Sequence, residues 1–134
     1  IAIEPRFADC DMFNHVNNAK YLTYIESARI AYYSQVSGIS NPCDFDMTLA
    51  SVKIDYIKPV FFGGTLHVYS RADRVGTKSW TLEHELRDAA TGELAAFAHT
   101  VIVHYDHDSG KSKPLPEDIV RKLEEFEGRK LRAS

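Results

Sequence analysis

The chain has 134 residues, of which 44% are hydrophobic, enough for one domain with its own core and no disulfide or metal crosslinks. The 16 basic and 19 acidic residues give a net charge of −3, which excludes a general positive field for nucleic acid or an anionic membrane surface. The two cysteines, Cys10 and Cys43, form no CxxC motif. We therefore predict free thiols, a cytoplasmic location and a single domain over residues 1–134.

Targeting and membrane segments are not expected. No stretch approaches the roughly 20 apolar residues that span a bilayer, and the N-terminus lacks the order of a signal peptide. The sequence begins at Ile1, so the existence of a removed targeting segment stays open.

The first third of the chain predicts a strand, a polar loop and a long helix. Apolar residues alternate over 1–7, as in a half-buried strand that runs into the loop 9–18. From Ala19 onward the apolar spacing becomes three or four residues, as on one helix face. This face comprises Leu22, Ile25, Ala28 or Arg29, Tyr32 and Val36. Asn17 or Asn18 is expected to cap the helix start, and Gly38 to end the helix.

The remainder predicts four strands and a short helix. Residues 50–56, 65–75 and 78–88 alternate between apolar and polar, whereas 94–105 is apolar at nearly every position and is expected to be buried on both faces. Residues 116–126 form a short amphipathic helix with Pro116 at its first position, and 128–134 are expected to fray. This order favours an α+β arrangement in which an antiparallel sheet is covered on one face by the long helix.

The loop before the long helix concentrates groups suited to acyl chemistry. Asp11 is followed four residues later by His15 and then by the helix start, where backbone N–H groups lack partners. A helix N-terminus can stabilise the oxyanion of an attacked carbonyl, and a nearby carboxylate can attack it or activate water. Asp and Asn are also common as plain helix caps, so both interpretations stay open.

The stretch DCDMFNHVNNAKYLTYIESAR resembles the signature of the hotdog-fold thioesterases, the 4-hydroxybenzoyl-CoA thioesterase-like family. Its D-x-D, HVNN and Y elements are also similar to those of plant acyl-ACP thioesterases. Asp55 to Pro59 and Gly76 to Ser79 agree with the family as well. The resemblance implies a hotdog fold, in which a curved antiparallel sheet wraps around one long central helix.

The resemblance also implies residue roles. Asp11 matches the catalytic carboxylate, as nucleophile or general base, and Asn18 falls where a backbone N–H polarises the thioester carbonyl. His15 and Asn17 line the same loop. This chain departs from the benzoyl-CoA branch at His15 and from the acyl-ACP branch at Phe13, which leaves open whether Asp11 or His15 transfers the proton.

Coenzyme A carries phosphates, and the turn from Arg74 to Ser79 offers two cations and hydroxyl groups for them. In the family this strand junction holds the CoA phosphates. The resemblance thus implies a substrate site that comprises Tyr21, Arg74, Thr77, Lys78 and Ser79. Without the resemblance, ordinary solvated charges on a hairpin explain the turn equally well.

Other candidate residues favour structural roles. His104, Asp106, His107 and Asp108 crowd one strand end and cannot all converge on one ion, so no metal site is expected. Alternation in an extended strand would place Asp9 and Asp11 on one side, and Cys10 on the other as a packed thiol. Glu26 and Arg29 suggest a surface helix pair. Five aromatic residues favour core packing, with pocket lining as a secondary role: Tyr21, Tyr24, Tyr32, Tyr33 and Trp80.

Together these features predict a thioesterase that hydrolyses acyl-CoA or acyl-ACP, needs no cofactor and forms a homodimer or homotetramer, since the family resemblance implies sheets that join between subunits. Neither nucleic acid nor a membrane is an expected partner. Two alternatives stay open. One is a hotdog-fold enoyl-CoA hydratase or dehydratase, whose usual Asp/His loop is not found here, and the other is a non-catalytic acyl-binding domain.

Overall fold

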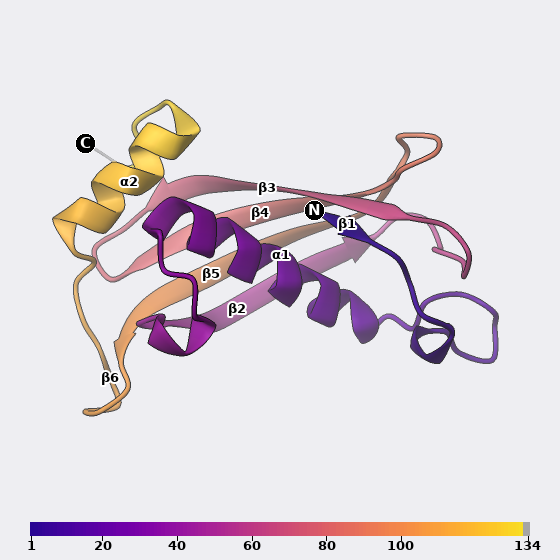
Figure 1. Cartoon of the computed structure of the whole chain (residues 1–134), viewed down its shortest axis with the longest axis horizontal. Coiled ribbons are helices and arrows are strands. Elements are labelled where there is room, and N and C mark those ends of the chain that lie inside the picture. Colours follow the sequence, from indigo (N-terminus) through magenta and orange to yellow (C-terminus); the bar gives the residue numbers. More distant parts are fainter. Residues whose placement is uncertain (133–134) are drawn as a thin grey trace.

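The computed structural model describes residues 1–132, which form an antiparallel sheet and two α-helices (Figure 1). The helices are α1 (Lys20–Ser37) and α2 (Glu117–Glu127). The strands are β1 (Ala2–Ile3), β2 (Met47–Tyr56), β3 (Leu66–Val75), β4 (Ser79–Asp88), β5 (Leu94–Asp106) and β6 (Lys111–Ser112). Short 3-10 turns occupy Phe7–Asp9 and Pro42–Asp44.

The strand order is β1-β3-β4-β5-β2, with β6 added beside β5. Figure 1 shows the long strands curving past α1, which crosses one face of the sheet, while α2 lies near one end. This is the predicted hotdog fold, with four long strands, the central helix and the short terminal helix in the expected order. No helix within residues 1–132 has the length and apolarity needed to cross a membrane.

The helix α1 is held by one buried face. Its C-terminal end is set by Gly38, which adopts the left-handed conformation at φ 79° and donates its N–H to Ser34. The buried residues include Tyr21 and Tyr24 as well as the predicted Ile25 and Tyr32. The expected burial of Leu22 is wrong, because the tyrosines at the helix start turn the buried face away from Leu22, whose side chain is 44% exposed.

Two apolar clusters fill the space between α1 and the sheet, one centred on Trp80 and the other on Leu86. All five aromatic residues assigned to packing are buried, which confirms that prediction. His84 projects from the same face of β4 as Trp80 and Leu86 and is fully buried. Its Nδ1 lies 2.7 Å from the Ser70 hydroxyl, and its Nε2 has no partner within residues 1–132. Burial and the charge of Arg29 lower the pKa of His84 to about 4.

Three expectations from the sequence are corrected by tertiary contacts. The first strand covers only Ala2–Ile3, because the chain then bends into a 3-10 turn. The strand β5 is buried on its α1 side but only half-buried on the other, since no second layer covers that face within residues 1–132. Residues 128–132 dock instead of fraying: Leu131 is buried, and its carbonyl accepts a hydrogen bond from Val75 at 3.0 Å. Residues 133–134 lie outside the described part.

The long outer strand β2 is exposed along most of its length. It pairs with β5 on one side only, and α1 lies closer to β3 at the other side of the sheet. An unpaired edge of this length, with free backbone donors and acceptors, is a surface for pairing with another strand.

Candidate active site

The polar loop before α1 folds back on itself as a small hairpin. Cys10 and Val16 form an isolated antiparallel bridge, and the Asp11 N–H donates to the His15 carbonyl at 3.0 Å. The tip is a tight turn in which the Asn14 N–H donates to the Asp11 carbonyl at 3.0 Å. Asn14 takes a left-handed conformation, with φ 64°, which asparagine tolerates better than most residues. The hairpin therefore holds Asp11 and His15 side by side.

Asp11 and His15 are close enough to interact. Their nearest side-chain atoms, Asp11 Oδ1 and His15 Nδ1, are 4.0 Å apart, and both side chains are about one-third exposed or less. Asp11 Oδ1 also accepts the Phe13 N–H at 2.9 Å, which orients the carboxylate. The His15 ring stacks on Phe13 and meets the edge of Phe61. The pair combines a solvent-accessible carboxylate with an adjacent imidazole, as proton transfer requires.

Asp9 has a role that the sequence did not predict. The expectation that Asp9 and Asp11 share one side rested on a strand that does not form, since Phe7–Asp9 is a 3-10 turn. The Asp9 side chain is 3% exposed and accepts hydrogen bonds from the Arg6 N–H at 3.0 Å and the Tyr24 hydroxyl at 2.7 Å. These donors, the Arg6 N–H above all, lower the pKa of Asp9 to about 2 despite its burial. Through the hydrogen bond with Tyr24, Asp9 thus holds the loop against α1.

Neither predicted asparagine is the N-cap of α1: Ala19 takes that position and offers no side-chain cap, while Asn17 supports the turn just before the helix. Asn17 Oδ1 accepts the Ala19 N–H at 3.0 Å, and the Asn17 carbonyl accepts the Lys20 N–H at 2.8 Å. The regular helix begins at Lys20, but Ala19 already has helical angles, so the first turn is entered from Asn17. The Asn17 N–H itself donates to the Asp9 carbonyl at 2.8 Å.

The Asn18 N–H differs from those on either side of it. Within residues 1–132 it has no hydrogen-bond acceptor, whereas the amides of Val16, Asn17, Ala19 and Lys20 are all paired. The Asn18 carbonyl accepts the Tyr56 hydroxyl at 3.0 Å, which ties the helix start to the end of β2. A free amide at a helix N-terminus is a ready donor to a developing negative charge.

A surface hollow opens at this point, lined by residues of the loop, α1 and the segment after β2. His15 and Asn18 line it from the loop, and Tyr56, whose hydroxyl donates to the Asn18 carbonyl, lines it from the end of β2. Tyr21, predicted to contact substrate, is 2% exposed and packs edge-on against the Tyr56 ring at 5.0 Å, so it supports the wall of the hollow. The imidazole of His15 and the free amide of Asn18 therefore lie at one small opening, and the Asp11 carboxylate lies next to His15, outside the lining of the hollow.

The predicted phosphate-binding turn lies at the other end of the sheet. Arg74, Thr77 and Lys78 are exposed and Ser79 is half-buried, and the turn is closed by a hydrogen bond from Gly76 N–H to the Ser79 carbonyl. Since β3 spans ten residues, about 30 Å separates this turn from the helix start. A single chain therefore does not bring the two predicted clusters together.

The C-terminal segment adds a cation that the sequence had left unassigned. Arg132 lies beside Val75 in a parallel bridge and lines a hollow together with Arg74 and Thr77. Its guanidinium donates to Glu117 at 2.7 Å. No local motif in the sequence marks this residue, because its position depends on the docking of residues 128–132.

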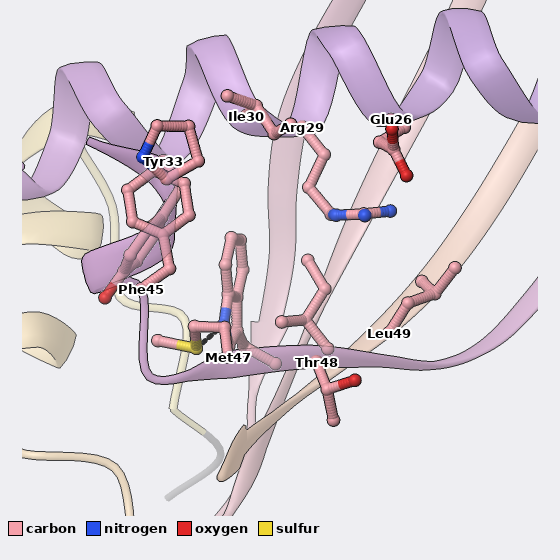
Figure 2. Close-up of a pocket in the computed structure, with 11 residues that line it drawn as sticks. Glu26, Arg29, Ile30, Tyr33, Phe45, Met47, Thr48 and Leu49 are labelled. Atoms are coloured by element: carbon pink, nitrogen blue, oxygen red, sulfur yellow. Dashed lines mark hydrogen bonds between the residues drawn. The ribbon is translucent and has the colours of Figure 1, made fainter. Parts of the chain in front are cut away.

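A second, mostly apolar cavity lies between α1 and β2 and is shown in Figure 2. It has a volume of about 180 Å³ and is partly open to solvent, and Tyr33, Phe45 and Met47 lie at one end of it (Figure 2). The Trp80 Nε1–H contacts the Met47 sulfur at 3.4 Å in its wall. The remaining lining residues are Glu26, Arg29, Ile30, Pro42, Thr48, Leu49, Trp80 and Ile102.

The expected surface pair of Glu26 and Arg29 is not formed. No ion pair within 4 Å joins them, and Figure 2 shows the Arg29 guanidinium extending into the space between α1 and β2. Arg29 is half-buried, and burial lowers its pKa while the charge of Glu26 partly offsets this effect. The reason is tertiary: α1 leaves β2 uncovered, so the Arg29 side chain fills the gap.

The two histidines at the end of β5, where no metal site was expected, each lie within hydrogen-bonding distance of a backbone carbonyl. His104 is buried, with Nδ1 2.9 Å from the Pro114 carbonyl, and His107 Nε2 lies 3.0 Å from the Phe45 carbonyl. Cys10 is half-buried against the cluster around Leu86, which agrees with its assignment as a packed thiol.

Comparison with known proteins defines the family. Residues 5–123 match the thioesterase-like superfamily. The chain is 32% identical to Bacillus subtilis YsmA over 110 residues, 82% of this chain and 74% of that protein. It is 27% identical to the long-chain acyl-CoA thioesterase FadM of Escherichia coli, covering 92% of this chain and 96% of FadM. A thioesterase from Thermus thermophilus, solved in complex with coenzyme A and zinc, superposes with a TM-score of 0.88 at 34% identity, covering 98% of this chain and 95% of that one.

The curled sheet, the central helix and this match together define a hotdog-fold thioesterase. The chain belongs to the thioesterase-like superfamily and is a thioester hydrolase.

Proposed function

We propose that this protein is an acyl-CoA thioesterase that uses Asp11 and the backbone amide of Asn18 to hydrolyse the thioester. The observation that carries the assignment is the Asn18 N–H, free among paired neighbours within residues 1–132 and beside the hollow that His15 lines. The relation to FadM, named as a long-chain acyl-CoA thioesterase, supports coenzyme A as the carrier.

In the proposed reaction the thioester carbonyl oxygen accepts the Asn18 N–H. Asp11 takes a proton from a water molecule as that water attacks the carbonyl carbon, and the resulting oxyanion is held by the same amide. The C–S bond then breaks, the proton passes to the departing CoA thiolate, and the carboxylic acid is released. His15 Nδ1 lies 4.0 Å from Asp11 Oδ1, where the imidazole can relay this proton or change the basicity of the carboxylate.

A second route begins with attack of the Asp11 carboxylate on the carbonyl, which gives a mixed anhydride that water then hydrolyses. Only this second route allows the water oxygen to enter the Asp11 carboxylate. A single turnover in ¹⁸O-labelled water puts the label into the Asp11 side chain if water attacks its carboxyl carbon, and only into the product acid under the general-base route. Both routes use only groups of this chain and water.

The phosphates of CoA are assigned to the turn from Arg74 to Ser79 of a second copy of the chain. The free edge of β2 can pair antiparallel with the same strand of another copy. A two-fold axis through β2 then sets the Tyr56 end of one subunit against the Met47 end of its partner. The helix start of each subunit is thereby brought toward the cationic turn of the other. Light scattering is expected to give about 30 kDa or a multiple, against 15.2 kDa for one chain.

The acyl group is assigned to the apolar cavity between α1 and β2. From Asn18 to Ile30 the helix advances about 18 Å, since each residue adds about 1.5 Å. The lining is predominantly apolar around Ile30, Tyr33 and Met47, as aliphatic chains prefer. A chain that starts at the Asn18 amide and runs along α1 reaches this cavity only if it is long, which favours long-chain acyl groups.

A panel of acyl-CoAs from short to long chains, with aromatic ones added, tests the proposal by thiol release. Wild type is expected to hydrolyse long chains with the highest kcat/KM. Asp11→Asn is expected to lower kcat by about 10²-fold or more, as for loss of a general base or nucleophile. The matched control, Asp108→Asn on the exposed turn after β5, is expected to retain full activity. No hydrolysis of any thioester by wild type would refute the assignment.

A further inference from the structure

The outer face of the sheet, turned away from α1, carries a cluster that mixes one imidazole with two carboxylates. Asp73, Glu83 and His99 lie on β3, β4 and β5, and one ligand atom from each lies within 4.8 Å of the other two. All three side chains are half-buried. Glu83 and His99 are direct cross-strand partners in the antiparallel ladder, so their proximity follows from the register.

Asp73 joins them because of a β-bulge. The pairing of β3 with β4 shifts between Ala72 and Arg74, so Asp73 is the extra residue. Ala72 and Val75 both point into the core, which leaves Asp73 and Arg74 together on the outer face. Bulges of this kind re-aim side chains. Here the bulge turns a carboxylate toward the Glu83 and His99 pair.

The cluster has unused ligand capacity. The Arg71 Nε donates to Glu83 Oε2 at 3.0 Å, and Arg129 approaches Asp73 Oδ1 at 3.8 Å, so each carboxylate keeps a second oxygen outside these contacts. Within residues 1–132 the His99 ring makes no hydrogen bond. Asp73 and His99 also line a surface hollow that gives access from solvent.

We propose that Asp73, Glu83 and His99 form a binding site for one zinc ion per chain. Zinc takes His nitrogen and carboxylate oxygen at about 2.0–2.2 Å, and tetrahedral geometry puts its ligands about 3.4 Å apart. The three donors reach this spacing by small side-chain rotations, and water from the hollow supplies the fourth ligand. The imidazole favours zinc over magnesium, which prefers oxygen donors and octahedral geometry.

The site is separate from the proposed reacting groups. It lies on the face opposite α1, whereas Asp11, His15 and the Asn18 amide surround the helix start. Its expected role is structural, since an ion there joins three neighbouring strands. The zinc ion competes with Arg71 for Glu83, so removing this arginine is expected to strengthen binding.

The test is calorimetric titration of metal-free protein with zinc chloride, repeated with magnesium chloride. Wild type is expected to bind one zinc per chain and no magnesium. His99→Ala and Asp73→Asn are each expected to weaken binding by about tenfold or more, since even outer-shell losses cost about 10–100-fold. Arg71→Gln is expected to tighten it. His67→Ala, which removes a half-buried histidine six residues before Asp73 on the same strand, is the matched control and is expected to leave binding unchanged.

Thermal melts followed by circular dichroism keep the test independent of enzymatic activity. Each variant is expected to show a cooperative melt without metal, and zinc is expected to raise the Tm of wild type and His67→Ala but not of His99→Ala. Absence of saturable zinc binding by wild type, or equal zinc affinity in His99→Ala, overturns the proposal.

Discussion

Replacing Asn18 with proline removes the backbone amide hydrogen that we assign to the oxyanion. Proline is tolerated in turn positions whose N–H makes no hydrogen bond, and Asn18 lies in the turn just before α1, next to Asn17, whose Oδ1 accepts the Ala19 N–H. The Asn18 carbonyl, which accepts the Tyr56 hydroxyl, is retained in the variant. The Asn18 side chain is exposed, so its loss disturbs little packing.

The expected size of the effect follows from the neighbouring amides. Asn17 N–H is committed to the Asp9 carbonyl at 2.8 Å and Ala19 N–H to Asn17 Oδ1 at 3.0 Å, so neither can replace the lost donor. Loss of one oxyanion donor costs about 10²–10³-fold in kcat, or about 2.7–4 kcal/mol. The free energy of unfolding is expected to change by no more than about 1 kcal/mol.

The assay is steady-state hydrolysis of a long-chain acyl-CoA followed by thiol release, together with urea unfolding of each variant. Asn18→Ala keeps the amide and is expected to retain kcat, which separates the role of the backbone from that of the side chain. If folded Asn18→Pro keeps kcat within about threefold of wild type, the Asn18 amide is not the oxyanion donor.

Three further predictions concern stability and substrate binding. Because the pKa of His84 is about 4 in the folded protein against an ordinary 6.5, the unfolded chain takes up the proton first as pH falls, and stability is lost between about pH 6.5 and 4. Between pH 7 and 5 the free energy of unfolding of wild type is expected to fall by about 2 kcal/mol because of this group, and that of His84→Gln is expected to fall correspondingly less. Urea unfolding at several pH values measures this, and an equal pH dependence of the two unfolding free energies would contradict the reasoning. Tyr24→Phe removes a hydrogen-bond donor from the buried Asp9 carboxylate and is expected to lower the free energy of unfolding by about 1–3 kcal/mol. An unchanged urea midpoint would argue against a stabilising role of the hydrogen bond between Asp9 and Tyr24. The double variant Arg74→Ala/Lys78→Ala is expected to raise KM for acyl-CoA by about tenfold with little change in kcat, and an equal rise with acyl-pantetheine, which lacks the phosphates, would rule out phosphate recognition.

Local sequence patterns predicted the structure correctly wherever the residues of one segment alone determine it. The helix from Lys20 and its end at Gly38 follow from spacing and C-terminal capping within a few residues. The strands β3, β4 and β5 follow from alternation, because side chains on successive positions face opposite sides of a sheet. The side-by-side placement of Asp11 and His15 follows from four-residue spacing across one tight turn.

Errors arose where the outcome depends on a distant segment. Asp9 is buried because Tyr24, fifteen residues later, donates a hydrogen bond to it, and the short 3-10 turn replaces the expected strand. Residues 128–132 are ordered because Val75 and Glu124 offer hydrogen-bond partners. Arg29 turns into a cavity because α1 and β2 stand apart. None of these partners is encoded in the local pattern.

The sequence by itself determined the order of elements through periodicity and the hotdog arrangement through its resemblance to a family, and it predicted the loop of Asp11 and His15 as the candidate site from a dense local motif. Only the tertiary structure decided which amide stays free at the helix start, and that one chain holds the loop of Asp11 and His15 and the cationic turn at opposite ends of its sheet. It alone brought Asp73, Glu83 and His99 together, because strand register and a single bulged residue set contacts across 26 positions of the chain. Register and packing depend on all strands at once, and for that reason a local pattern cannot specify them.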